Sequence, residues 1–263
     1  MKNWYKKYNG KEGYTELVNK NNSPLKYIRF GMLRLKRGGC WKGSLKNEEA
    51  LVTVLSGKAE ITAGGETFIT GERKNVFTGK PGSVYLSKNE VFSITALSDL
   101  EAAISAVPAR NKYTTMPVPE CKVGVRVAGK GLFTRDIYDI LNNNEIKTDR
   151  IIAGETFHRP GQWSCIPPHK HDVNRLPRES KLEELYFFKM LPKDGFGFER
   201  LYTEGEKFDY TWTLKDNTLL CMPKGYHALA VCPGYRMYYL WILAGKERVL
   251  KQYMDPRYEW LNN

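Results

Sequence analysis

The chain has 263 residues, of which 41% are hydrophobic and 13% aromatic, so it can bury a sizeable core and does not have a disordered composition. Its formal net charge is +12, yet Lys and Arg are spread along the sequence and form no basic run typical of nucleic-acid binding. We therefore expect no nucleic-acid partner. A small acidic substrate fits better, because a positive field would concentrate it near a cleft.

No apolar run approaches the length of a membrane helix, and the basic N-terminus lacks the apolar segment of a signal peptide. The cysteines form no C-x-x-C pair, so neither a disulfide framework nor a cysteine zinc site is expected. These observations favour a cytoplasmic protein with no membrane partner. The five cysteines are Cys40, Cys121, Cys165, Cys221 and Cys232.

Short apolar or alternating runs, separated by turn residues, fill most of the chain and predict an all-β fold of sandwich or barrel type. Residues 111–149 have weaker strand signals, and we interpret them as a connecting segment between a first unit, 1–110, and a second unit, 150–263. The best helix candidate lies in this segment, over residues 133–141, with Thr134 as its N-cap.

The two units resemble distant repeats of each other. Glu49 opens an apolar strand, turn and strand in the first half, and Glu184 opens a similar pattern in the second half. Later, a Gly-Lys-Pro-Gly turn at residues 79–82 and a Pro-Lys-Gly turn at residues 223–225 each adjoin a short apolar run. This repetition predicts a duplicated β unit.

All four histidines lie in the second half, and three of them have the spacing of a metal site. His169 and His171 are two positions apart, so on a strand both imidazoles face the same side and can reach one ion. Glu184 shares a strand face with Tyr186 and Phe188 by the same two-residue period, and a carboxylate among aromatic side chains requires a cation or a proton. His227 follows the Pro/Gly turn.

The predicted ligand set is thus three nitrogens and one oxygen, which suits a divalent transition metal and leaves positions open for a substrate. Any one histidine alone is more often an ordinary core or surface residue. The ordered set on predicted strands reverses that preference. His158 has no partner at ligand spacing, and we place it behind the ligands or on the surface. The predicted ligands are His169, His171, Glu184 and His227.

The order of these ligands resembles the two metal-binding motifs of the cupin superfamily. Relative to a typical cupin, residues 172–181 form a polar insertion, which we expect to fold as a loop over the cavity mouth. The wider sequence resembles the 5-deoxy-glucuronate isomerase family of myo-inositol catabolism, closely over residues 150–260 and more loosely over the first half. The segments that carry this resemblance are Gly154-Glu-Thr-Phe-His-Arg-Pro-Gly-Gln-Trp-Ser, Leu182-Glu-Glu-Leu-Tyr-Phe-Phe and Pro223-Lys-Gly-Tyr-His.

The resemblance implies two tandem cupin barrels, which are double-stranded β-helices of jelly-roll type. It also implies an aldose–ketose isomerisation that converts 5-deoxy-glucuronate to 5-keto-2-deoxy-gluconate. One divalent metal ion per chain would polarise the C1 and C2 oxygens. We favour Zn or Mn, and Fe, Co and Ni also suit the donors. The first half has no histidine, so we expect a structural N-terminal cupin without a metal site, and a homodimer is compatible with it.

The residues that move the proton and bind the substrate are less well defined by the sequence. Candidates for proton transfer, chosen by strand face, are Glu155, Tyr186 and Tyr238. Cations near the metal motif could bind the substrate carboxylate, although each could equally be a solvated surface charge. These cations are Arg159, Arg175, Arg178 and Lys181.

Two other functions remain open at this point. A cupin dioxygenase could use Fe at the same ligands, and it would consume oxygen, unlike an isomerase. A non-catalytic sugar-binding or regulatory cupin is the other alternative, although the sequence shows no helix-turn-helix to favour a regulator.

Overall fold

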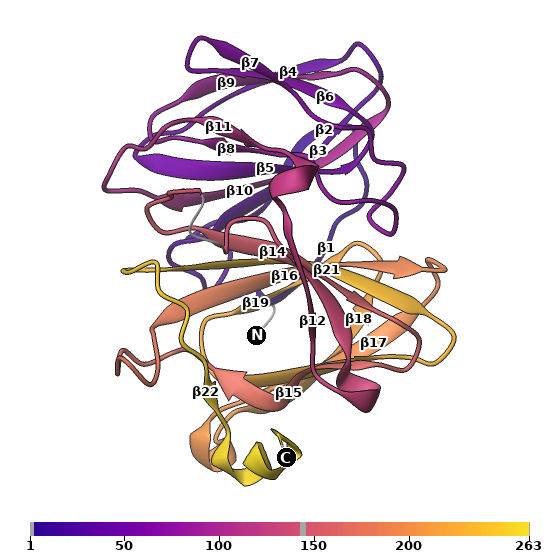
Figure 1. The fold of residues 1–263 in the computed structure, drawn as a ribbon, viewed down its shortest axis with the longest axis vertical. Helices are drawn as coiled ribbons and strands as arrows, with labels where there is room; N and C mark the ends of the chain where they lie inside the picture. Colours follow the sequence, from indigo (N-terminus) through magenta and orange to yellow (C-terminus); the bar gives the residue numbers. More distant parts are fainter. Residues whose placement is uncertain (1–2, 143–145, 263) are drawn as a thin grey trace.

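The computed structural model describes residues 3–142 and 146–262, which form two β barrels, the first above the second in Figure 1. This confirms the predicted all-β class. Each barrel consists of a larger sheet on the side that meets the other barrel and a smaller sheet on the outer side.

The N-terminal barrel pairs a six-stranded sheet with a four-stranded sheet. The larger sheet has the order β11 (Met116–Val118), β8 (Ser83–Leu86), β5 (Glu48–Ser56), β10 (Leu100–Pro108), β3 (Arg29–Leu35) and β2 (Gly13–Val18). The smaller sheet has the order β4 (Cys40–Ser44), β9 (Val91–Ala96), β6 (Ala59–Ala63) and β7 (Glu66–Ile69).

The C-terminal barrel pairs a seven-stranded sheet with a five-stranded sheet. The larger sheet has the order β1 (Tyr5–Lys7), β19 (Thr218–Met222), β16 (Leu182–Leu191), β21 (Arg236–Gly245), β14 (Ile152–His158), β13 (Arg135–Asp139) and β12 (Gly124–Ala128). The smaller sheet has the order β18 (Asp209–Lys215), β17 (Phe196–Tyr202), β20 (Tyr226–Val231), β15 (Trp163–Lys170) and β22 (Tyr253–Met254).

The helices of the described residues are short 3₁₀ segments: η1 (Glu120–Lys122), η2 (Gly131–Phe133), η3 (Glu204–Glu206) and η4 (Pro256–Asn262). The predicted helix over residues 133–141 is wrong, because residues 135–139 form β13. Ile137 and Asp139 alternate with more exposed neighbours, and β13 pairs with β12 and β14 on its two sides. Strand pairing on both sides therefore overrides the weak helical pattern. None of the described helices is long and apolar enough to cross a membrane.

The two barrels exchange strands near the ends of the predicted units. β1, drawn in indigo, lies in the lower barrel of Figure 1, where it pairs with β19. In the opposite direction, β11 of the connecting segment pairs with β8 of the upper barrel. The rest of that segment supplies β12 and β13 to the lower barrel. The predicted connecting segment, 111–149, therefore contributes strands to both barrels.

The two-residue period of β16 explains how the barrels meet. Tyr186 and Phe188 point into the C-terminal barrel, and Leu185 and Phe187 point into the core between the barrels. Phe30 of the N-terminal barrel packs on Phe187 with ring centroids 5.7 Å apart. Both faces of this central sheet are therefore buried, and one of them faces the candidate site.

Corresponding pairings confirm the repeat but shift its alignment by one residue. Ala50 pairs with Ala106 and Leu86 in the N-terminal barrel, as Glu184 pairs with Leu243 and Met222 in the C-terminal barrel. Ala50 therefore takes the place of Glu184, and Glu49 is the counterpart of Glu183. By the same reasoning Ser44 and Val91, which pair with each other, take the places of His169 and His227. The N-terminal barrel thus has no carboxylate at the position of Glu184, and its sequence contains no histidine.

Candidate metal centre

His171, Glu184 and His227 meet inside the C-terminal barrel. Glu184 Oε2 lies 3.0 Å from His171 Nε2 and 3.4 Å from His227 Nε2, and all three side chains are at most 5% exposed. Three strand segments supply them, namely the end of β15, β16 and β20. Such close donor atoms in a buried site suit a shared cation, which would offset the cost of burying the carboxylate.

His169 completes the predicted set on the same side of β15. Its ring lies 4.4 Å from the ring of His227 and 6.1 Å from that of His171, between centroids. Burial, reinforced by the two neighbouring imidazoles, holds the pKa of His169 well below its ordinary value. The ring is therefore neutral, which is the form that can ligate a metal. The structure thus brings all four predicted ligands together.

Two further side chains reach the cluster, and the sequence analysis assigned neither of them to the site. Cys165 forms a second metal-type group with His169 and His227, with donor atoms within 4.8 Å of one another. The amide Nε2 of Gln252, in the segment before β22, lies 2.8 Å from His169 Nε2. Cys165 lies four residues before His169, and on a regular strand this even separation places both side chains on one face. The sequence therefore contained a signal for Cys165. Gln252 reaches the site only through tertiary packing.

A distortion in β15 places Cys165. The pairing of β15 with β20 is regular at Ser164 and resumes at His169, with a register shift between them. Cys165 itself has a φ of 56°, in the left-handed region that side chains rarely adopt. Bulged strands of this kind reorient a side chain and are frequent beside functional sites.

Tyr186, a predicted catalytic candidate, does lie at the cluster. Its hydroxyl oxygen is 3.3 Å from His227 Nε2 and 3.6 Å from Cys165 Sγ. Burial, followed by the nearby Cys165 and Glu184, raises the pKa of Tyr186 well above its ordinary value. The hydroxyl therefore keeps its proton, so it can donate a hydrogen bond to an oxygen but is a poor base.

Glu155 and Tyr238, the other two catalytic candidates, face away from the cluster and into the contact between the barrels. Arg73 of the N-terminal barrel forms a two-pronged ion pair with Glu155, at 2.7 and 2.9 Å, and the Tyr238 hydroxyl donates to the same carboxylate at 2.7 Å. We correct their assignment to a structural one. The neighbouring positions, Thr156 and Tyr239, are the ones that reach the site.

The inserted segment is fastened to the ligand strands by Glu179, which is fully buried. Glu179 accepts hydrogen bonds from Lys170 Nζ at 2.7 Å and from the backbone of Asp172 and Val173. Although burial opposes it, this donor set lowers the pKa of Glu179 to about 2. Asp172 also accepts from the backbone of Gly225, two residues before His227, at 2.9 Å. The insertion thus links the two segments that carry the histidines.

None of the four predicted substrate-binding cations lines the pocket beside the ligands. Arg175 is paired with Glu179 at 3.1 Å. Lys181 lines a different surface pocket, beside Tyr27. Arg178 and Arg159 are exposed, and Arg159 lies in the turn after β14. The structure thus corrects the prediction that these four cations bind the substrate. Arg175 pairs with Glu179 of its own loop, and the other three side chains are exposed elsewhere on the surface.

The pocket beside the ligands is lined by the inner faces of both sheets and by the chain after β21. Two arginines that the sequence analysis missed, Arg126 and Arg135, also line it, and both come from the β12–β13 pair. The other lining residues are Ile137, Thr156, Ser164, Cys165, His169, Glu184, Tyr186, Tyr239, Trp241, Leu243, Leu250 and Gln252.

Two buried polar residues of this barrel have no hydrogen-bond partner among the described residues. They are His158, which stacks on Tyr239 with ring centroids 5.6 Å apart, and Glu199 of β17. Burial raises the pKa of Glu199 well above its ordinary value, so the side chain is protonated and neutral. The prediction placed His158 behind the ligands or on the surface, and its 1% exposure excludes the surface.

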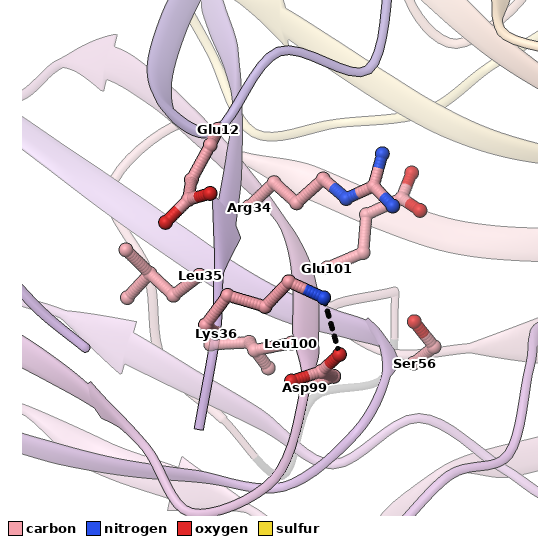
Figure 2. Close-up of a pocket in the computed structure, with 8 residues that line it drawn as sticks. All are labelled: Glu12, Arg34, Leu35, Lys36, Ser56, Asp99, Leu100 and Glu101. Carbon is pink, nitrogen blue, oxygen red and sulfur yellow. Dashed lines mark hydrogen bonds and ion pairs between the residues drawn. The ribbon is translucent and has the colours of Figure 1, made fainter. Parts of the chain in front are cut away.

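A different pocket, in the N-terminal barrel, is a poor active-site candidate. Figure 2 shows its charged lining, in which Lys36 Nζ donates to Asp99 Oδ2 at 2.8 Å. Both side chains are about two-thirds exposed, so the pair is solvated. The metal-type groups of the described residues all lie in the C-terminal barrel.

Comparisons with known proteins find relatives that match nearly the whole chain. The model of a family described as KduI/IolB family matches residues 4–261. A 5-deoxy-glucuronate isomerase from Halalkalibacterium halodurans is 38% identical over 246 residues, covering 93% of this chain and 91% of the relative. One from Bacillus subtilis strain 168 is 36% identical over 246 residues, with the same two coverages.

Solved structures extend the likeness to the whole fold. The crystal structure of an IolB-like protein from Salmonella typhimurium has a TM-score of 0.95 at 28% identity, and the match covers 99% of this chain and 100% of that one. An oxalate decarboxylase mutant from Bacillus subtilis has a TM-score of 0.66 at 12% identity, covering 96% of this chain and 79% of that one. The second likeness concerns the fold alone and confirms the predicted pair of cupin barrels.

Proposed function

This chain belongs to the KduI/IolB family, and we propose that it is a metal-dependent isomerase that converts 5-deoxy-glucuronate to 5-keto-2-deoxy-gluconate. The observation that carries the proposal is the convergence of His171, Glu184 and His227 beside a pocket, in a chain whose relatives are named for this isomerisation. A role in myo-inositol catabolism and a cytoplasmic location follow as part of the proposal.

The donor set fits one divalent ion. Three imidazoles and one carboxyl group, from His169, His171, His227 and Glu184, converge in a buried place, and Cys165 is a further donor on one side. We propose Zn or Mn as the native metal, and the set also accommodates Fe, Co or Ni. When bound, the ion would act as a Lewis acid on the oxygens of the substrate carbonyl and the adjacent hydroxyl.

The chain's own residues would orient the substrate and manage its protons. The Tyr186 hydroxyl, held in its protonated form, would donate a hydrogen bond to a substrate oxygen that gains negative charge. The amide of Gln252 lies beside His169 Nε2. It would therefore orient the His169 ring where His169 ligates through Nδ1. Trp241 and Leu243 make part of the pocket wall apolar and limit the access of water.

Two other proposals concern partners. The substrate is a small acidic sugar, which the net charge of +12 would attract. A homodimer stays a prediction, which size-exclusion chromatography with light scattering can test.

The decisive experiment is an isomerase assay on 5-deoxy-glucuronate before chelation, after chelation and after metal readdition. We expect activity to disappear and return. His227→Ala should lose metal, whereas His158→Ala, which removes an equally buried histidine of the same barrel, should keep it. Product formation without metal would contradict the proposal. Oxygen uptake coupled to turnover would instead favour the Fe-dioxygenase alternative.

A further inference from the structure

The pocket beside the ligand cluster has an unbalanced charge. Its lining contains one carboxylate, Glu184, which is directed at the histidines, and two guanidinium groups, Arg126 and Arg135. Neither arginine lies near the metal motifs in the sequence. Both are brought to the pocket by the β12–β13 pair, which extends the larger sheet at its edge.

The two arginines differ in whether their charge is already neutralised. Arg126 forms an ion pair with Asp139 at 2.7 Å, and its side chain is 49% exposed. Arg135 forms no ion pair within the described residues. Its Nη1 donates to the carbonyl of Phe133 at 3.1 Å, and its Nε is buried without a partner in that part of the chain. A buried guanidinium nitrogen without an acceptor is costly, so an anionic partner there would be stabilising.

The backbone around Arg135 holds this guanidinium in place. Arg135 itself pairs with Ala128 of β12, and the next two residues, Asp136 and Ile137, pair with β14. At the turn between β12 and β13, Gly129 has a φ of 80°, and a Cβ there would lie 2.9 Å from Arg135 Nη1. The glycine is thus required by the positive φ of the turn and by the close approach of the Phe133 carbonyl oxygen, which accepts from Arg135 Nη1.

Arg135 is also near enough to the reacting side of the barrel to matter. Its charge acts on His169, Cys165 and Tyr239, all of which line the same pocket. A sugar acid with its carbonyl end at the ligand cluster carries its carboxylate at the other end of the chain. Arg135 can therefore receive that carboxylate while the carbonyl end stays beside the histidines.

We propose that Arg135 binds the carboxylate of the substrate and makes this site selective for sugar acids over neutral aldoses. This inference rests on the proposed function and deepens it. Planar, two-pronged hydrogen bonding from a guanidinium fits a carboxylate better than an ammonium does. The binding is present in the ground state and in the transition state, because the carboxylate keeps its charge throughout, so it acts mainly on KM.

The test compares Arg135→Gln, Arg135→Lys and Arg175→Gln with the unaltered, metal-loaded protein. Arg135→Gln should lower kcat/KM for 5-deoxy-glucuronate by roughly ten- to a hundred-fold, mostly through KM. Arg135→Lys should fall between. Arg175→Gln removes a guanidinium already paired with Glu179 and should leave KM unchanged. Metal content and thermal unfolding must match in all proteins, which separates loss of binding from loss of fold.

A second measurement keeps the inference independent of the proposed reaction. Calorimetric titration with glucuronate and with glucose, which lacks the carboxylate, should show a preference for the acid that Arg135→Gln abolishes. If the protein isomerises the substrate and Arg135→Gln retains its KM, the inference fails and the proposed function stands. If the protein shows no isomerase activity but Arg135 still decides the preference for glucuronate, the proposed function fails and the inference stands. Absence of both activity and preference overturns the inference.

Discussion

Glu49 and Glu183 hold the two barrels together in a reciprocal way. Glu49 of the N-terminal barrel accepts hydrogen bonds from the backbone of residues 149–151, at 2.7 to 2.9 Å, where the chain enters β14 of the other barrel. Glu183 accepts from the backbone of residues 26–28, at 2.6 to 2.8 Å, where the chain enters β3. Each carboxylate thus fixes the start of a strand in the opposite half.

This relationship predicts different effects for two adjacent glutamates. Glu183→Gln should lower the free energy of unfolding by about 1.5–3 kcal/mol, because it weakens charge-assisted hydrogen bonds, and it should leave the metal content unchanged. Glu184→Gln should reduce bound metal and activity with little loss of stability in the metal-free protein. Denaturant unfolding and elemental analysis of both variants provide the check. A loss of metal in Glu183→Gln would contradict the assignment of opposite faces.

Metal removal should abolish activity while the chain stays folded. The interior of the N-terminal barrel and the core between the barrels are apolar and contain no predicted ligand, so most of the buried surface does not depend on an ion. We expect cooperative thermal unfolding to persist after chelation, with a lower midpoint because the metal binds only the folded state. Circular dichroism during heating measures it, and a non-cooperative transition would show that the fold requires the metal.

The two tyrosines that the sequence suggested for catalysis, Tyr186 and Tyr238, should differ in the effect of removing their hydroxyl groups. Tyr186→Phe removes a hydroxyl 3.3 Å from His227 Nε2 and should lower kcat by roughly ten- to a hundred-fold. Tyr238→Phe removes a hydroxyl bonded to Glu155 in the contact between the barrels, and it should cost about 1–3 kcal/mol of stability without changing kcat or KM. Steady-state kinetics and urea unfolding test the pair. Equal kinetics in both variants would remove Tyr186 from the mechanism.

His158 should make the free energy of unfolding depend on pH. Burial, with a smaller effect from the charge of Arg135, lowers the pKa of His158 to about 3, whereas the unfolded chain binds this proton near the ordinary value of 6.5. Between these values the unfolded state holds more protons, so stability falls as the pH decreases from 6.5 towards 3. The contribution is at most about 1.4 kcal/mol per pH unit.

His158→Phe retains a ring that can stack on Tyr239 and removes this titration. The metal-free variant should therefore lose less stability than the unaltered metal-free protein between about pH 6.5 and about pH 5 in urea unfolding. At about pH 8.5 His158 is almost fully deprotonated in the folded and the unfolded state, so the comparison there isolates the packing change. An identical pH slope in the two proteins would show that His158 does not contribute.

The sequence by itself determined the β class, the duplicated unit and the four ligand candidates. These features are local, because turn residues delimit the strands and the two-residue period fixes which side chains share a face with Glu184. Resemblance of the second half to a known family added the expected reaction. The linear sequence also located the insertion before Glu184, although not what its cations contact.

Only the tertiary structure decided which catalytic and substrate-binding candidates reach the site. β21 is buried on both faces, one towards the N-terminal barrel and one towards the ligands, so no alternation of polarity could tell Tyr238 from Tyr239. Arg135 lies on β13, more than thirty residues before His169, and it joins the pocket only because β13 pairs with β14. Strand order in the sheet, rather than distance along the chain, brings these side chains together.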